Sequence, residues 1–206
     1  MTKKQLIFII LTVILLAFFV YFFLRGDENI TNYPPKNQTV VAFGDSLIEG
    51  VGATPGNDFV SIVERNLGIE IINKGLSGDT TISALDRMGS VLAEEPGVVI
   101  MLLGGNDALR RIPKKETFEN LGKIIENFQS EGAIVVLLGV RGGILFDGYD
   151  GDYEELSEKY HTAYVSNVLD NLFTNQKYMS DSIHPNDQGY AIIGERVTSV
   201  LKKLLK

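Results

Sequence analysis

Residues 39–47 read TVVAFGDSL, and this stretch decides the fold. Thr39 to Phe43 is an apolar run without polar alternation, which is typical of a strand buried on both faces of a parallel sheet. The turn residues Gly44 and Asp45 follow, and Ser46 stands where a strand-to-helix turn would expose a side chain at the sheet edge. The stretch therefore predicts a buried strand that ends at a serine.

The rest of the chain alternates short apolar runs with segments of helical period. Further strands are expected at Ile69–Asn73, Val98–Leu103, Ala133–Val140 and Ala163–Ser166. Amphipathic helices are expected at Asp58–Leu67, Thr80–Glu94, Lys115–Gln129, Tyr153–Tyr160 and Asp187–Leu205. Parallel strands need crossover helices between them. The pattern predicts a three-layer α/β/α sandwich around a five-stranded parallel sheet, formed by a single domain over residues 38–206.

The composition excludes several classes of protein. The chain has 206 residues and no cysteine, which rules out disulfides, thiolate nucleophiles and zinc–thiolate sites. Residues 30–206 carry 16 basic and 24 acidic side chains and therefore a net charge of −8. Such a domain repels phosphate backbones, and the sequence contains no basic patch. We therefore expect no nucleic-acid partner.

The N-terminal segment is typical of a membrane span. Leu6 to Leu24 is a stretch of 19 uncharged residues, apolar apart from Thr12 and Tyr21. As a helix it would extend roughly 28 Å, enough to cross the hydrocarbon layer of a bilayer. A cleavable signal peptide has a shorter apolar region and a small-residue cleavage site, which this run lacks. We expect residues 1–25 to form an uncleaved signal anchor, with secretion after cleavage as the alternative.

The flanking charges orient this predicted anchor. Lys3 and Lys4 precede the apolar run, and Arg25 alone follows it. The positive-inside rule then places the N-terminus in the cytoplasm and the domain outside, in the periplasm or at the cell surface. Residues 26–37 are polar and contain two consecutive prolines, so we expect them to form a linker.

Three residues at the predicted carboxyl edge of the sheet have the chemistry of a nucleophile, a base and an orienting acid. The Ser46 hydroxyl is a weak nucleophile unless a base takes its proton. His184 can act as that base, and Asp181, three residues earlier, can fix its tautomer. Singly, Ser46 is explained as a helix cap and His184 as a surface residue. The second histidine, His161, is expected to be exposed and without a chemical role.

Two further residues can supply donors to a developing oxyanion. Gly78 follows the second predicted strand, and without a Cβ its backbone N–H can approach a substrate closely. Asn106 follows the third strand and offers a side-chain amide, and the Ser46 backbone N–H is a third donor. Individually, Gly78 and Asn106 are also ordinary turn residues.

Four motifs resemble the blocks of the SGNH (GDSL-type) hydrolase superfamily. They are Gly44–Leu47 (GDSL), the glycine of SGDTT at Gly78, Gly104–Asp107 (GGND) and Asp181–Pro185 (DSIHP). The surrounding strings are similar to the bacterial thioesterase I/lysophospholipase L1 branch. The resemblance implies a flavodoxin-like sheet and a serine hydrolase without metal or cofactor. It implies activity on small acyl esters and thioesters, including lysophospholipids, and we expect a monomer.

Apolar residues beside these motifs are candidates for an acyl groove. Ile48, Leu76 and Leu109 lie next to the proposed catalytic positions, and Ile144 and Phe146 follow the fourth predicted strand. Ordinary core packing is the alternative explanation for all five.

Three other functions fit parts of the pattern. A carbohydrate O-deacetylase would use the same residues on a cell-envelope polysaccharide. A nucleotide-binding module is suggested by Gly50 and Gly52, but Pro55 occupies the third position of the G-x-G-x-x-G motif. A non-catalytic surface-binding protein could keep the fold, although every expected catalytic residue is present.

Overall fold

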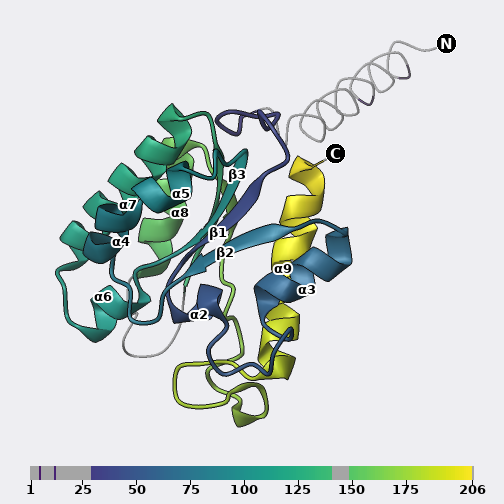
Figure 1. Ribbon diagram of the computed structural model, residues 1–206, viewed down its shortest axis with the longest axis vertical. Helices are drawn as coiled ribbons and strands as arrows, with labels where there is room; N and C mark the ends of the chain where they lie inside the picture. Colours follow the sequence, from purple (N-terminus) through teal and green to yellow (C-terminus); the bar gives the residue numbers. More distant parts are fainter. Residues whose placement is uncertain (1–4, 6–11, 13–28, 141–148, 206) are drawn as a thin grey trace.

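A five-stranded parallel sheet forms the centre of the computed structural model, which describes Gln5, Thr12 and residues 29–140 and 149–205 (Figure 1). The strands are β1 (Val40–Gly44), β2 (Ile71–Gly75), β3 (Val98–Leu102), β4 (Ile134–Leu138) and β5 (Ala163–Val165). Their spatial order is β2-β1-β3-β4-β5, and every neighbouring pair is parallel. This is the flavodoxin-like order, with a topological switch point between β1 and β3. The predicted sheet is confirmed.

Helices cover both faces of the sheet (Figure 1). One layer contains α3 (Phe59–Leu67) and α9 (Asp187–Leu204), which pack against each other. The other contains α4 (Thr81–Arg87), α5 (Gly89–Leu92), α7 (Lys114–Ser130) and α8 (Tyr149–Tyr160). Two short helices, α2 (Ser46–Glu49) and α6 (Gly105–Leu109), follow β1 and β3, and the 3₁₀ turn η2 (Gln176–Tyr178) precedes α9. The three-layer arrangement is therefore as predicted.

The core lies on both faces of the three central strands. Every residue of β1, β3 and β4 is buried, as their unbroken apolar runs predict. The edge strand β2 differs, because only Ile71 among its residues is buried. β2 is thus less buried than the three central strands, and it has a neighbouring strand on one side only.

Several predicted elements have different bounds in the structure, and α8 starts four residues before the expected Tyr153. The second strand is shifted by two residues from Ile69–Asn73, because Gly68 ends α3 in the left-handed conformation and pairing with β1 starts at Ile71. The helix expected over Thr80–Glu94 is divided into α4 and α5 at Met88, whose N–H bonds to Leu85 O in a tighter turn.

Residues 30–37, part of the expected linker, pack against the domain. Ile30 and Tyr33 contact the hydrophobic core, and Asn32 donates side-chain hydrogen bonds to Gln129 O and Ala133 O at 2.8 and 3.0 Å. Within the residues the structure describes, no helix is long and apolar enough to cross a bilayer. The predicted span Leu6–Leu24 lies outside the described residues apart from Thr12.

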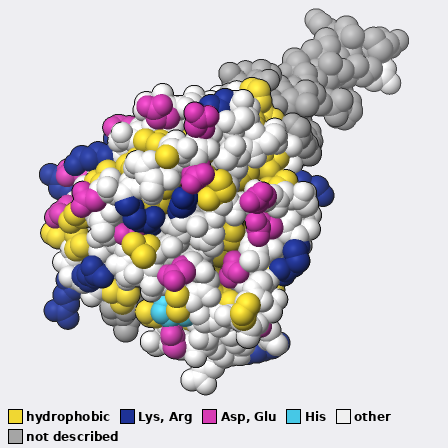
Figure 2. All heavy atoms as spheres, in the orientation of Figure 1, with side chains coloured by type: hydrophobic (Ala, Val, Ile, Leu, Met, Phe, Trp, Pro, Cys, Tyr) yellow, Lys and Arg dark blue, Asp and Glu magenta, His cyan; other side chains and the backbone are white. Residues whose placement is uncertain are grey.

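Charged side chains of both signs are interspersed over the face of the domain seen in Figure 2. This distribution agrees with the sequence, in which acidic residues exceed basic ones without a basic cluster. The viewed face therefore has no broad positive surface of the kind that binds a phosphate backbone.

Candidate active site

Ser46 is the first residue of α2, directly beyond the carboxyl end of β1. Asp45 is the N-cap, and its side chain accepts a hydrogen bond from Leu47 N at 3.0 Å. The helix is only four residues long and ends at Gly50 in the left-handed conformation. Asp45, rather than Ser46, therefore caps this helix, and the serine hydroxyl is available for other contacts.

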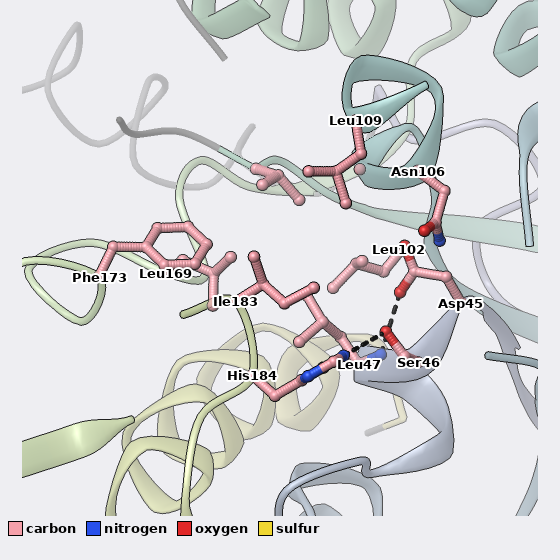
Figure 3. A pocket seen from close by; sticks show the side chains of 12 residues that line it. Asp45, Ser46, Leu47, Leu102, Asn106, Leu109, Leu169, Phe173, Ile183 and His184 are labelled. Carbon is pink, nitrogen blue, oxygen red and sulfur yellow. Dashed lines mark hydrogen bonds between the residues drawn. The ribbon is translucent and has the colours of Figure 1, made fainter. Parts of the chain in front are cut away.

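Ser46, His184 and Asp181 form a continuous hydrogen-bonded chain, of which Figure 3 shows the Ser46–His184 contact. Ser46 Oγ lies 3.1 Å from His184 Nε2, and His184 Nδ1 lies 2.7 Å from Asp181 Oδ2. The serine comes from the end of β1, and the other two residues come from the loop before α9, far along the sequence. The fold therefore assembles a nucleophile, a base and an orienting carboxylate at distances suited to proton transfer.

The Asp181 carboxylate is fixed by the turn that carries His184. Its Oδ1 atom accepts hydrogen bonds from the backbone N–H groups of Ile183 and His184 at 2.8 and 2.7 Å. Partial desolvation acts to raise the pKa of Asp181, but hydrogen bonds from the His184 ring and these two amides outweigh it and lower the pKa to about 2. The side chain is half exposed, and it stays ionised at neutral pH.

A glycine allows the His184 loop to sit against the loop after α2. Gly52 has a φ of +96°, and a Cβ at this position would lie 2.5 Å from Pro185 O and 3.1 Å from His184 Cβ. Gly50 and Gly52 thus have a structural explanation, because Gly50 ends α2 and Gly52 permits the close approach.

Gly78 and Asn106 lie in the turns that follow β2 and β3. Asn106 Nδ2 donates to Asp79 O at 2.9 Å, which ties the two turns together. Gly78 has a φ of +79°, and its carbonyl accepts from Arg110 at 2.8 Å. The buried Tyr153 hydroxyl donates to Leu103 O at 2.6 Å and supports the start of the turn that follows β3. These turns bring the two predicted oxyanion donors to the carboxyl edge that carries Ser46.

Buried acids surround these turns, and sequence reasoning missed them. Asp45, Asp79 and Asp107 are 3%, 2% and 0% exposed. Burial, followed by the charges of Asp79 and Asp107, raises the pKa of Asp45 to about 7 despite the stabilising bond from Leu47 N. Asp79 is paired with Arg87 at 2.6 Å. Their positions in the sequence could have indicated them. Asp79 and Asp107 directly follow the site residues Gly78 and Asn106, and Asp45 directly precedes Ser46.

An apolar cavity opens beside Ser46 (Figure 3). Besides Asp45, Ser46, Gly105, Asn106 and His184, it is lined by Leu47, Leu102, Leu109, Val140, Leu169, Phe173 and Ile183. Leu169 and Phe173 come from the segment before η2, which carried no motif. The cavity provides an apolar surface next to the hydroxyl, as an acyl chain requires.

The five residues predicted to form the acyl groove do not all line the cavity. Leu109 lines the cavity, while Leu76 is 51% exposed and is not among the lining residues. Ile48 is fully buried in the core and does not line the cavity, which agrees with core packing, the alternative explanation for this residue. Ile144 and Phe146 lie outside the described residues.

His161 is exposed and follows α8, away from Ser46 in the sequence and in the fold. Its carbonyl accepts a hydrogen bond from Thr31 N at 2.9 Å. In the described parts of the chain, no three acidic or histidine side chains are grouped to hold a metal ion.

Known proteins are similar to this chain in sequence and in fold. Residues 42–192 match the GDSL-like Lipase/Acylhydrolase family. Esterase TesA of Pseudomonas aeruginosa is 31% identical over 82% of this chain and 90% of its own. Thioesterase 1/protease 1/lysophospholipase L1 of Escherichia coli K12 is 23% identical over 81% of this chain and 85% of its own. A crystal structure of TesA, 30% identical, superposes with a TM-score of 0.76 over 82% of this chain and all of that one. The resemblance inferred from the four motifs is confirmed.

The Asp45→Asn variant is expected to be more stable than the wild type at pH 8. The folded state holds the Asp45 proton up to about pH 7, whereas the unfolded chain releases it near pH 4, so stability falls as pH rises between these values. The amide can still accept from Leu47 N but cannot ionise, so it avoids a cost on the order of 2–4 kcal/mol. Urea unfolding at pH 5 and pH 8 measures both effects. Equal pH dependence in the variant and the wild type would contradict the assignment.

Proposed function

Because the chain belongs to the GDSL-like lipase/acylhydrolase family, we propose that it hydrolyses acyl esters and thioesters through an acyl intermediate on Ser46. It is a carboxylic ester hydrolase of the SGNH type, as its relatives named esterase and thioesterase indicate. The observation that carries the proposal is the hydrogen-bonded chain from Asp181 through His184 to Ser46.

In the first half of the reaction, Ser46 Oγ attacks the acyl carbonyl carbon. His184 Nε2, 3.1 Å from this oxygen, takes the hydroxyl proton as the bond forms. The imidazolium that results is stabilised by the ionised Asp181, whose bond to Nδ1 also fixes the ring orientation. His184 then returns the proton to the leaving alcohol or thiol, and an acyl-Ser46 ester remains.

The charge on the carbonyl oxygen would be held by the Ser46 and Gly78 backbone N–H groups and the Asn106 side chain. These donors belong to three turns fixed by the sheet, and the Asn106 amide is oriented by Asp79 O. Preorganised donors stabilise the tetrahedral intermediate without reorganising during the reaction. In the second half, water attacks the acyl-enzyme with His184 again as base, and the acid leaves.

The cavity supports an acyl substrate with an apolar chain. Leu109, Phe173 and Ile183 lie on the same side of the serine and can contact the chain (Figure 3). We propose a lysophospholipase, arylesterase or acyl-CoA thioesterase specificity on this basis. Acetyl removal from a polysaccharide is the competing specificity, since it needs the same catalytic residues and a much smaller acyl site.

A panel of p-nitrophenyl esters separates the two specificities. The apolar cavity predicts that kcat/KM is retained or rises from C4 to C8, because each buried methylene contributes about 0.8 kcal/mol of binding. Leu109→Ala and Phe173→Ala should lower kcat/KM for C8 more than for C2. A steep fall in wild-type kcat/KM beyond C2 would instead favour the deacetylase.

Catalytic variants test the assigned roles. Ser46→Ala and His184→Ala should each lower kcat at least about 10³-fold, and Asn106→Ala about 10²- to 10³-fold, because each removes a group needed in the transition state. His161→Ala is the matched control and should keep full activity. Circular dichroism verifies folding, and substantial esterase activity in Ser46→Ala would exclude that serine as the nucleophile.

For localisation, we propose that Leu6–Leu24 anchors the enzyme in a membrane with the domain on the extracytoplasmic side. The length of the apolar run and the charges flanking it support this proposal. The full-length protein should remain in the membrane pellet after carbonate washing, whereas release into the supernatant would favour cleavage and secretion.

A further inference from the structure

Residues 31–37, which lead from the N-terminal apolar run to β1, are attached to the domain at the amino edge of the sheet. These residues bond to backbone carbonyls that lie shortly before strands β3, β4 and β5. Thr31 N bonds to His161 O at 2.9 Å, before β5, and Lys36 Nζ bonds to Glu131 O at 2.6 Å, before β4. Asn37 Nδ2 bonds to Glu95 O at 2.9 Å, before β3.

The active site lies at the other edge. Ser46 and Asn106 follow the carboxyl ends of β1 and β3, and Figure 1 shows α2 and α6 at the opposite end of the sheet from the segment that leads into β1. Five-residue strands alone separate the two edges by roughly 17 Å, and the turns on each side add to this distance.

The residues between the apolar run and the domain are too few to let the domain turn over relative to the bilayer. Seven residue steps separate Leu24 from Thr31, whose backbone N–H is bonded to His161 O, and they span at most about 25 Å when fully extended. A domain of this length is roughly 40 Å across. A tether attached at one edge is therefore too short to turn the domain over and place the opposite edge nearest to the bilayer.

We propose that the active site faces away from the anchoring membrane and acts on a water-soluble acyl ester or thioester, not on lipids of that bilayer. This inference rests on the proposed esterase function and on the proposed anchor. The exposed Leu76 and Leu109, at 51% and 39%, then lie on the face turned toward the aqueous phase.

Two single-cysteine variants measure the orientation, because the natural chain has no cysteine. Glu131→Cys lies at the amino edge, and Thr174→Cys lies beside the cavity residue Phe173; both positions are exposed. Each full-length variant carries a fluorescent donor in phosphatidylcholine:phosphatidylglycerol vesicles that contain an acceptor lipid. Energy transfer should be strong from position 131 and weak from position 174. Equal or reversed transfer, or failure to float with the vesicles, overturns the proposal.

Two substrates test the consequence for catalysis. The wild type in vesicles should hydrolyse soluble p-nitrophenyl butyrate at the same rate before and after solubilisation in detergent. A chromogenic acyl ester coupled to a phospholipid of the same bilayer should be hydrolysed at least about tenfold faster after solubilisation, because detergent removes the geometric restriction. Equal rates on the lipid-coupled ester overturn the orientation, and inactivity on both substrates overturns the esterase function instead.

A second inference concerns Arg87, whose guanidinium joins three parts of the site. It is paired with Asp79 at 2.6 Å and donates to Gly44 O and Lys74 O, each at 2.9 Å. Its Cζ also lies 4.3 Å from the centre of the Phe43 ring. The contacts fix the ends of β1 and β2 to the turn that contains Asp79.

Each oxyanion donor is close in sequence, or hydrogen-bonded, to a group that Arg87 contacts. Ser46 follows Gly44 by two residues, Gly78 immediately precedes Asp79, and Asn106 is hydrogen-bonded to Asp79 O. We infer that Arg87 is a positioning residue that sets the geometry of the oxyanion donors without contacting the substrate.

A double-mutant cycle with Asn106→Ala tests this role. Arg87→Lys keeps the charge but loses the planar fork, so kcat should fall about 10- to 100-fold with KM changed less than about twofold. In the Asn106→Ala background the same change should lower kcat by a smaller factor than in the wild-type background, because one of the three donors that Arg87 positions is already missing. Equal losses in both backgrounds, or no loss in the wild-type background, overturn the inference.

A control and a milder variant accompany the cycle. Lys74→Gln breaks the neighbouring ion pair with Glu94, 2.7 Å long, and should leave kcat unchanged. If Arg87→Lys does not fold, Ser83→Ala replaces it in the cycle, because Ser83 Oγ donates to the other Asp79 oxygen. It should show a smaller kcat loss with the same dependence on Asn106, and an additive loss counts against the inference.

Discussion

The site depends on the close packing of the end of β1 between its two neighbours. Gly44 pairs with Gly75 of β2 and Leu102 of β3, and a Cβ on Gly44 would lie 2.0 Å from Leu102 O. A Cβ on Gly75 would lie 2.2 Å from Glu49 N in α2. Neither position has room for a side chain, so the three turns that leave these strands start at fixed distances from one another. These distances set the relative positions of Ser46, Gly78 and Asn106.

This packing has an electrostatic cost. The turns place Asp45, Asp79 and Asp107 in the interior, where only the guanidinium of Arg87 supplies an ion-paired cation among the described contacts. Asp107 is held by the backbone N–H and hydroxyl of Thr81, and Asp45 accepts from the backbone N–H of Leu47. Functional sites commonly retain such locally unfavourable groups, which the remaining core stabilises. Here the large apolar core of β1, β3 and β4 supplies that stabilisation.

The sequence predicts the fold and the reactive residues better than the substrate pocket. Buried strands and the residues that end them are local features, so the position of Ser46 and its convergence with Gly78 and Asn106 follow from the parallel order. The buried state of Ile48 and the contribution of Leu169, Phe173 and Ile183 depend on how loops pack, and no periodicity encodes that. Packing of residues 30–37 against the amino edge also escaped prediction, because their polar side chains bond to distant backbone carbonyls.

The central claim is that Ser46 is a nucleophile activated by His184, and covalent labelling tests it most directly. A fluorophosphonate probe should modify the wild-type protein at Ser46 alone, as peptide mass spectrometry would show. Labelling should be absent in Ser46→Ala and greatly slowed in His184→Ala, because the hydroxyl then lacks its base. Labelling that persists in Ser46→Ala, or that proceeds at the wild-type rate without His184, would contradict the account.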